Sequence, residues 1–355
     1  MVVTADGELP LPWLAAPLAQ ALATQRGHAL LLHAAPGNGA LALALTLAQA
    51  WLCESEGAAK PCGRCGSCRL VQSRLHPDLF VLLPETLRRE HGWLLATDKP
   101  EGDEAKRKPS RQIRIDEVRS LIDWSTKTSA RGRGKVALLH PAEALNLQSA
   151  NALLKTLEEP PVSTRLLLSC ADPALLLPTV RSRCQRQRLS EPPAEQAAAW
   201  LAGKGFDDEA DARTLLAACS GRPLDALALL QSGVDAAAWS ALPAAVAAGR
   251  AAALGGWPLP RALDALHKLC HDAMALAAGA PARYFAAGQV PVHGQSALLS
   301  AWSRELGRAA RHDEHPWHEM LLVESLVRQG AQALAPAVAT QRRASGRWVD
   351  TLPAP

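Results

Sequence analysis

The sequence predicts an α/β domain, in which helices flank a parallel sheet, followed by a region made of helices alone. Two observations predict this fold class. Over the first 190 residues, short apolar runs alternate with helical stretches, which is the pattern of a parallel sheet with crossover helices. Beyond that point an Ala- and Leu-rich helical pattern continues to about residue 334.

Five short runs are the predicted strands of the sheet. They are Ala29–His33, Leu79–Leu83, Val136–His140, Arg165–Ser169 and Gln185–Leu189. The stretches between them predict helices over Leu41–Cys53, Asp116–Lys127 and Leu147–Leu157. Segment Arg88–Ser110 is polar and charged, and we expect it to be a mobile excursion.

Proline and glycine mark the expected domain boundaries. Ser190–Pro193 contains two prolines, which can end the last strand and begin a helix. A second hinge is expected near Gln231–Gly233. We therefore expect an α/β domain at 1–190, a small helical domain at 191–231, a larger helical domain at 232–334 and a disordered tail at 335–355.

The overall composition argues against several classes of protein. The 355 residues carry 38 basic and 34 acidic side chains, a net charge of +4 that does not by itself indicate nucleic-acid binding. Aromatic residues make up 4%, too few to favour a base-stacking platform. The sequence shows neither an apolar span typical of a membrane helix nor a signal-peptide pattern, so we expect a cytoplasmic protein. Its eight cysteines are then not expected to form structural disulfides.

Residues 34–41 lie between a predicted strand and a predicted helix, as a phosphate-binding loop does, and read Ala-Ala-Pro-Gly-Asn-Gly-Ala-Leu. In a working loop, Lys and then Ser or Thr follow the last glycine and hold the phosphates and Mg²⁺. Here Gly37 and Gly39 are followed by Ala40 and Leu41. Either the glycine turn is coincidental, or the fold is that of an NTPase that no longer hydrolyses its nucleotide.

Four cysteines form a compact motif with the spacing C-x8-C-x2-C-x2-C. They are Cys53, Cys62, Cys65 and Cys68. Four thiolates satisfy a closed tetrahedral Zn²⁺ site, which is structural because no position remains for water or substrate. A redox Cys-x-x-Cys pair, accidental cysteines and a nucleic-acid-reading zinc ribbon are the alternatives. A zinc ribbon is less favoured because only Lys60, Arg64 and Arg69 lie nearby.

A hydrolytic site also needs an Asp, usually followed by Glu, at the end of a second strand. The strand over Val136–Leu139 instead ends in His140 and Pro141, and the nearest acid is Glu143. Downstream, Asn151–Pro161 predicts an amphipathic helix stopped by a proline pair.

Taken together, these motifs resemble the clamp-loader branch of the AAA+ superfamily, and within it the delta-prime family of bacterial DNA polymerase III. The similar segments lie within about Trp13–Leu189: Trp13-Leu14, His28–Leu31, Pro36–Gly39, the cysteine motif, His76–Asp78, Asn151–Pro161 and Ser182–Cys184. The resemblance implies that the α/β domain at 1–190 is an AAA+ domain. It also implies a helical lid at 191–231 and a collar that joins subunits at 232–334.

The resemblance assigns a role to Arg183. Ser182–Cys184 looks like the Ser-Arg-Cys motif, whose arginine reaches into the ATP site of the next subunit. A guanidinium supplied in trans stabilises the charge that phosphoryl transfer develops. The residues alone are also compatible with a solvated basic strand. In the lid run Gly221–Ala226, Leu224 occupies the position of the family's sensor arginine.

These features imply a non-hydrolysing clamp-loader subunit that acts in DNA replication as a scaffold. It would supply Arg183 to a neighbouring ATPase subunit, bind structural zinc and hydrolyse no ATP itself, although it belongs to a DNA polymerase holoenzyme. The implied partners are homologous ATPase subunits, the delta subunit and, through the complex, a sliding clamp and primed DNA. An active motor ATPase and a zinc-ribbon nucleic-acid-binding protein are the alternatives.

Overall fold

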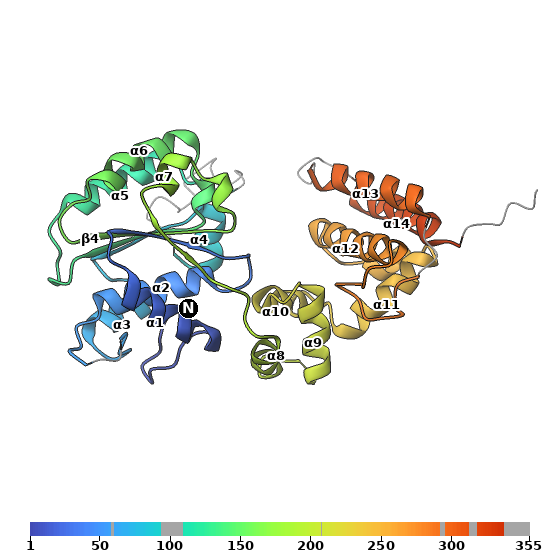
Figure 1. Ribbon diagram of the computed structural model, residues 1–355, viewed down its shortest axis with the longest axis horizontal. Coiled ribbons are helices and arrows are strands. Elements are labelled where there is room, and N and C mark those ends of the chain that lie inside the picture. The colour runs from blue at the N-terminus through green and yellow to red at the C-terminus, as the bar shows by residue number, and fades with distance from the viewer. Residues whose placement is uncertain (58–59, 94–108, 207, 292–294, 312–317, 337–355) are drawn as a thin grey trace, which may run out of the picture. The chain divides into compact units, whose positions relative to one another are not determined.

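A computed structural model of the chain describes residues 1–57, 60–93, 109–206, 208–291, 295–311 and 318–336. It divides into two compact units, Met1–Gly233 and Val234–Pro355 (Figure 1). The first unit contains the sheet and the three helices that follow it, and the second is helical in its described residues. The predicted fold class is confirmed: a parallel sheet flanked by helices, and then helices alone.

All five predicted strands are present and pair in parallel in the order β2-β3-β4-β1-β5. Their bounds are β1 (Ala29–His33), β2 (Leu79–Leu82), β3 (Lys135–Leu139), β4 (Thr164–Cys170) and β5 (Gln185–Arg188). Residues 30–32 of β1 are at most 1% exposed. Parallel strands covered on both faces read as continuous apolar runs, which is why the sequence reveals them.

Helices cover both faces of the sheet (Figure 1). On one face lie α1 (Ala15–Thr24), α2 (Ala40–Leu52) and α3 (Gly66–Gln72), and on the other lie α5 (Ile115–Thr126), α6 (Leu147–Glu158) and α7 (Pro178–Arg181). Side chains alternate across a strand. Accordingly, Leu30 and Leu32 of β1 pack in the cluster with α1 and α2, whereas Leu31 packs in the cluster with α5 and α6. The predicted helices are confirmed to within one residue at each end.

The expectation that Arg88–Ser110 is an excursion is wrong at its start. Helix α4 (Glu85–His91) includes Arg88, whose side chain is fully buried. Its Nη1 lies 2.7 Å from Glu117 Oε1 on α5 and donates to the carbonyl oxygen of Leu83 at 2.6 Å. Charge alone therefore misled the prediction, because this arginine finds a buried partner. The rest of the segment, residues 94–108, lies outside the described residues.

Three short helices complete the first unit: α8 (Ala194–Ala202), α9 (Glu209–Ala218) and α10 (Pro223–Gln231). Pro223 begins α10, a position that tolerates the missing N–H. Two of these helices contact the N-terminal segment and the loop between β1 and α2. Trp200 of α8 meets Trp13 edge-on at 5.3 Å between ring centroids, and the backbone N–H of Leu224 donates to the carbonyl oxygen of Gly37 at 3.1 Å.

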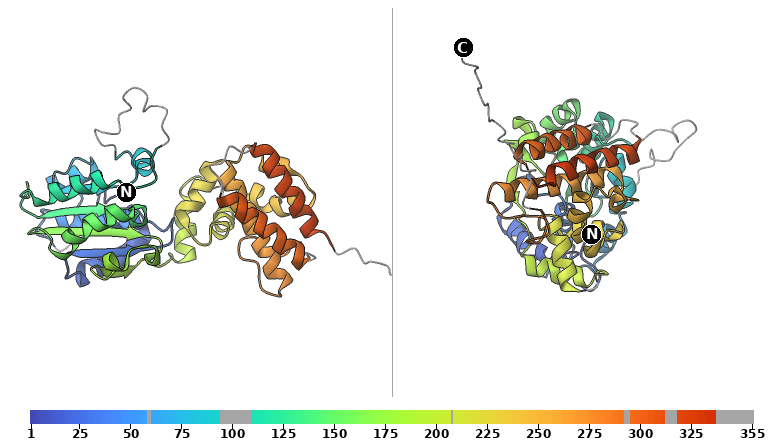
Figure 2. Two further views of the ribbon diagram at one scale, coloured as in Figure 1. Left: turned by 90° about the horizontal axis from the view of Figure 1, so that it is seen from above. Right: turned by 90° about the vertical axis from the view of Figure 1, so that its right-hand side faces the viewer.

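The second unit packs four helices around buried tryptophans. They are α11 (Ala236–Ala247), α12 (Leu259–Ala277), α13 (Ser296–Arg311) and α14 (Glu319–Leu334), and the last three lie side by side (Figure 2). Trp302 is 1% exposed, and a Cβ added at Gly330 would lie 2.6 Å from its ring, so α13 and α14 approach closely. Among the described helices of both units, none is long and apolar enough to cross a membrane. The expected tail lies outside the described residues beyond 336.

Candidate functional site

The loop between β1 and α2 has the shape of a phosphate-binding loop. It leaves β1 after His33 and enters α2 at Ala40. Gly37 and Gly39 have φ angles of 79° and 93°, a conformation that favours glycine. The predicted strand, glycine turn and helix are therefore confirmed.

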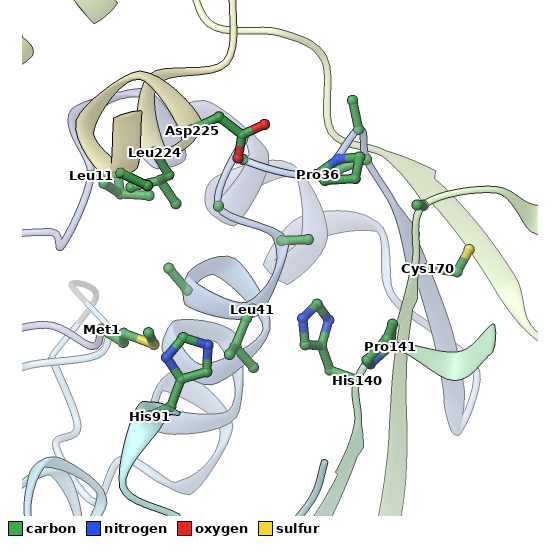
Figure 3. A pocket seen from close by; sticks show the side chains of 18 of the residues that line it. Met1, Leu11, Pro36, Leu41, His91, His140, Pro141, Cys170, Leu224 and Asp225 are labelled. Carbon is green, nitrogen blue, oxygen red and sulfur yellow. The ribbon is translucent and has the colours of Figure 1, made fainter. Parts of the chain in front are cut away.

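A cavity of about 640 Å³ lies over this loop (Figure 3). Its walls come from the loop, from the carboxyl ends of β3 and β4, from α4 and from α10. In open α/β sheets, ligands bind at the carboxyl ends of the strands. The cavity therefore occupies the place of a nucleotide site.

The walls of the cavity lack the charges that a triphosphate needs. Its ionisable side chains are Glu90, His91, His140, Glu143, Cys170 and Asp225, and none of the described lining residues is Lys or Arg. Ala40 and Leu41 stand where a working loop has Lys and a hydroxyl, and neither side chain can bind a phosphate or Mg²⁺. The cavity is thus mainly apolar, and its described walls carry carboxylates but no basic Lys or Arg side chain.

Neighbouring side chains press against the loop itself. A Cβ added at Gly37 would lie 2.5 Å from Asp225 Oδ1, and one added at Gly39 would lie 2.4 Å from Leu11 Cδ1. Leu224, at the expected sensor position, lines the cavity. Arg222 pairs with Asp225 at 2.8 Å. The only arginine of the run Gly221–Ala226 is thus paired with an acid that lies against the loop.

The end of β3 carries an uncharged group in place of the catalytic acid. His140 Nδ1 lies 2.6 Å from the hydroxyl oxygen of Ser169 on β4. Burial, and to a smaller extent the nearby His91, lower the pKa of His140 to about 4, so the imidazole is neutral at neutral pH. Both rings face the cavity, as Figure 3 shows. A neutral histidine cannot replace the carboxylate that holds Mg²⁺ in such sites.

Glu143, the nearest acid in sequence, is engaged elsewhere. Its Oε1 accepts hydrogen bonds from the backbone N–H groups of Ala171 and Asp172, the latter at 2.9 Å. These two residues follow β4. Glu143 therefore fixes the turn after β4, although it also lines the cavity.

Arg183 lies just after α7 and is not among the described residues that line the cavity. Its side chain is 33% exposed. Nη1 donates to the carbonyl oxygen of Thr179 at 2.8 Å, and Nη2 pairs with the carboxylate of Glu158, the last residue of α6. This guanidinium is therefore at the surface, where another protein can reach it.

The structure brings the four predicted metal ligands together. The sulfur atoms of Cys53, Cys62, Cys65 and Cys68 all lie within 4.8 Å of one another. The Cys53–Cys65 and Cys62–Cys68 sulfur distances are 4.0 and 3.9 Å. A tetrahedral site with metal–sulfur bonds of about 2.3 Å has sulfur–sulfur edges of about 3.8 Å. The cluster can therefore hold one four-coordinate metal ion such as zinc.

Hydrogen bonds and burial act on these thiols in opposite directions. The backbone N–H of Cys65 donates to Cys62 Sγ at 3.4 Å, which lowers the pKa of Cys62 to about 6. Burial raises the pKa of Cys53 and Cys68. Cys68 is fully buried, so its thiolate form requires a compensating positive charge such as a metal ion.

A buried network beside the cysteines explains the His76–Asp78 motif. His76 Nε2 lies 2.5 Å from the hydroxyl oxygen of Ser67 on α3. Asp78 accepts hydrogen bonds from the N–H groups of Ala130 and Arg131 at 2.8 and 2.9 Å. The motif can be recognised in the sequence, but its role is visible only in the structure. It holds the cysteine module and the loop before β3.

The fold and the site together define a P-loop-type α/β domain whose loop has the shape of a phosphate loop but carries Ala40 and Leu41 where a working loop has Lys and a hydroxyl. The family model described as "DNA polymerase III, delta subunit" matches residues 14–193, half of the chain. The chain belongs to this family.

Three relatives illustrate the similarity. The chain is 42% identical over 211 residues to DNA polymerase III subunit delta' of Pseudomonas aeruginosa, covering 59% of this chain and 58% of the relative. It is 34% identical over 224 residues to subunit delta' of Escherichia coli K12, covering 62% and 60%. It is 34% identical over 169 residues to subunit tau of Salmonella typhimurium, covering 48% and 22%. The chain thus spans less than two thirds of the length of each.

Proposed function

We propose that this protein is a clamp-loader subunit that hydrolyses no ATP itself and supplies an arginine finger to a neighbouring subunit. One contrast carries the proposal. The described walls of the cavity over residues 34–41 include no Lys or Arg, whereas Arg183 is not among these wall residues and has a side chain that is 33% exposed. A subunit that had only lost its own ATPase activity would have no reason to retain an arginine finger. A subunit that completes another protein's site would retain it.

The partners follow from the relatives. The chain is similar both to delta' subunits and to a tau subunit, so homologous chains of this kind can form one assembly. We infer that the neighbour receiving Arg183 is a homologous ATPase subunit, and that the complex also holds the delta subunit. Acting together, they would place a sliding clamp on primed DNA.

Each of three parts of the chain has its own role in this proposal. Residues 1–190 form the AAA+ domain, residues 191–231 the lid, and residues 232–334 the collar that joins the subunits. In this assignment the lid is docked onto its loop by the hydrogen bond from Leu224 to Gly37, at 3.1 Å. The chain then acts as a rigid scaffold, since it has no nucleotide cycle to open the contact.

The cysteine cluster is proposed to be a structural zinc site. Four thiolates fill the coordination sphere and leave no place for substrate. The ligands run from Cys53, at the end of α2, to Cys68, in the first turn of α3. They lie beside the N-terminal residues, since Gln49 of α2 bonds to both backbone groups of Val3 at 2.9 and 3.1 Å and donates to the carbonyl oxygen of Cys68 at 3.4 Å. The metal would therefore fix one side of the AAA+ domain and take no part in catalysis.

ATP hydrolysis by reconstituted complexes tests the proposal. The chain alone is expected to show no turnover. In the complex, Arg183→Ala should lower turnover at the one site that it serves by about 10³-fold or more, the range measured for arginine fingers. Arg186→Ala, an exposed arginine of β5, is the matched control and should leave turnover unchanged. Hydrolysis by the chain alone, or wild-type turnover with Arg183→Ala, would contradict the proposal.

A further inference from the structure

The finger residue is held by an acid of its own chain. Arg183 Nη2 pairs with Glu158, while Nη1 donates to Thr179 and lies 3.4 Å from the hydroxyl oxygen of Ser182. The Arg183 and Glu158 side chains are 33% and 50% exposed. The pair is thus at the surface, and a phosphate of another protein's ligand can compete for the guanidinium.

Glu158 occupies a poor position for a carboxylate on its own helix. It is the last residue of α6, and Glu159 follows it at the C-cap. The carboxyl end of a helix carries partial negative charge, so two acids there are disfavoured. Residues that are unfavourable for the stability of their own helix are expected at functional sites. Arg183 supplies the positive charge that offsets this conflict.

We propose that Glu158 is a positioning residue for the finger, which holds Arg183 at the end of α6 until a phosphate of the neighbour's ATP displaces it. This inference rests on the proposed function. The exchange replaces one anion by another, so the guanidinium is never left unpaired. Its strength is limited, since an exposed pair changes an equilibrium by up to about fivefold, or about 1 kcal/mol.

The variant Glu158→Gln tests the charge of this side chain separately from its shape. Glu158→Gln keeps the size of the side chain and a hydrogen-bond acceptor but removes the competing charge. In the reconstituted complex, this variant should raise kcat/KM for ATP by about two- to fivefold. The matched control is Glu159→Gln, an exposed acid at the next position, which should leave kcat/KM unchanged. Glu158→Asp keeps the charge and should match the wild type.

The double variant Glu158→Gln/Arg183→Ala connects the effect to the finger. It should behave like Arg183→Ala alone, because Glu158 acts only through Arg183. If Glu158→Gln leaves kcat/KM unchanged or lowers it while Arg183→Ala still reduces turnover, the holding role is wrong and the proposed function stands. If Arg183→Ala itself has no effect, the proposed function fails.

Discussion

The buried pair between Arg88 and Glu117 joins α4 to α5 and can be tested by removing one charge. Arg88 is fully buried and Glu117 is 9% exposed, with 2.7 Å between Arg88 Nη1 and Glu117 Oε1. Glu117 Oε2 also accepts the backbone N–H of Arg114 at 2.7 Å, at the start of α5. Glu117→Gln keeps the shape of this side chain and removes the carboxylate charge that pairs with Arg88.

The magnitude follows from the burial of the arginine. Removing one partner of a buried ion pair costs about 3–5 kcal/mol, because the remaining buried charge loses an interaction that offsets its desolvation. In a unit of the size of Met1–Gly233, each kcal/mol lowers Tm by about 2–4 °C. Glu117→Gln should therefore lower the Tm of this unit by about 6–20 °C. Helix α4 carries Glu90 and His91 of the cavity wall, so the wall should loosen as well.

Calorimetry and urea unfolding of the full chain measure this loss. The matched control is Asp116→Asn, which removes an acid from the same turn of α5. Asp116 pairs with Arg119 at 3.5 Å, with side chains 83% and 65% exposed, and such surface pairs contribute about 0–1 kcal/mol. The double variant Arg88→Met/Glu117→Leu should recover most of the loss, since apolar residues can replace a buried pair. A loss below about 1 kcal/mol for Glu117→Gln would refute the reasoning.

Two further predictions concern the metal site and the cavity. Cys68→Ser should abolish stoichiometric zinc binding and lower Tm, because a closed thiolate site contributes folding free energy. The control Cys270→Ser, outside the cluster, should retain the metal. Equal zinc contents of the two variants by elemental analysis would contradict the ligand set. His140 has a pKa near 4 in the folded chain against about 6.5 when unfolded, so the unfolded state binds more protons between these values. Stability should therefore fall by up to about 3 kcal/mol as pH drops from about 6.5 to 4, and His140→Gln should flatten this slope in urea titrations; an unchanged slope would show that another group titrates.

Local pattern predicted the sheet because each strand carries its own signal. The buried strands are continuous apolar runs, and the fifth predicted run, Gln185–Leu189, corresponds to the polar edge strand Gln185–Arg188. Helix α4 was missed because its charged residues resemble a solvated loop, and the burial of Arg88 depends on Glu117, far along the chain. Helix α3 was missed because its sequence is short and is dominated by the cysteine motif.

The candidate site shows the same division between local and distant information. The four cysteines lie within 16 residues, so their spacing alone predicted the cluster that the structure assembles. The motifs also show directly that Ala40, Leu41 and His140 stand where a hydrolytic site has Lys, Ser or Thr, and an acid. In contrast, the cavity walls combine residues 1, 10–11, 90–91, 224–225 and 228, whose approach depends on the complete fold. The contact of Arg183 with Glu158 likewise joins α6 to the segment after α7 and has no signature in either segment alone.

The most direct test of the central claim is the ATP turnover of a complex assembled from the partner ATPase subunits and this chain, with arginine or alanine at position 183. The variant should assemble normally, because Arg183 is a surface residue, 33% exposed. Turnover at the adjacent site should fall by about 10³-fold or more. An assembled complex with undiminished turnover at every site would contradict the account.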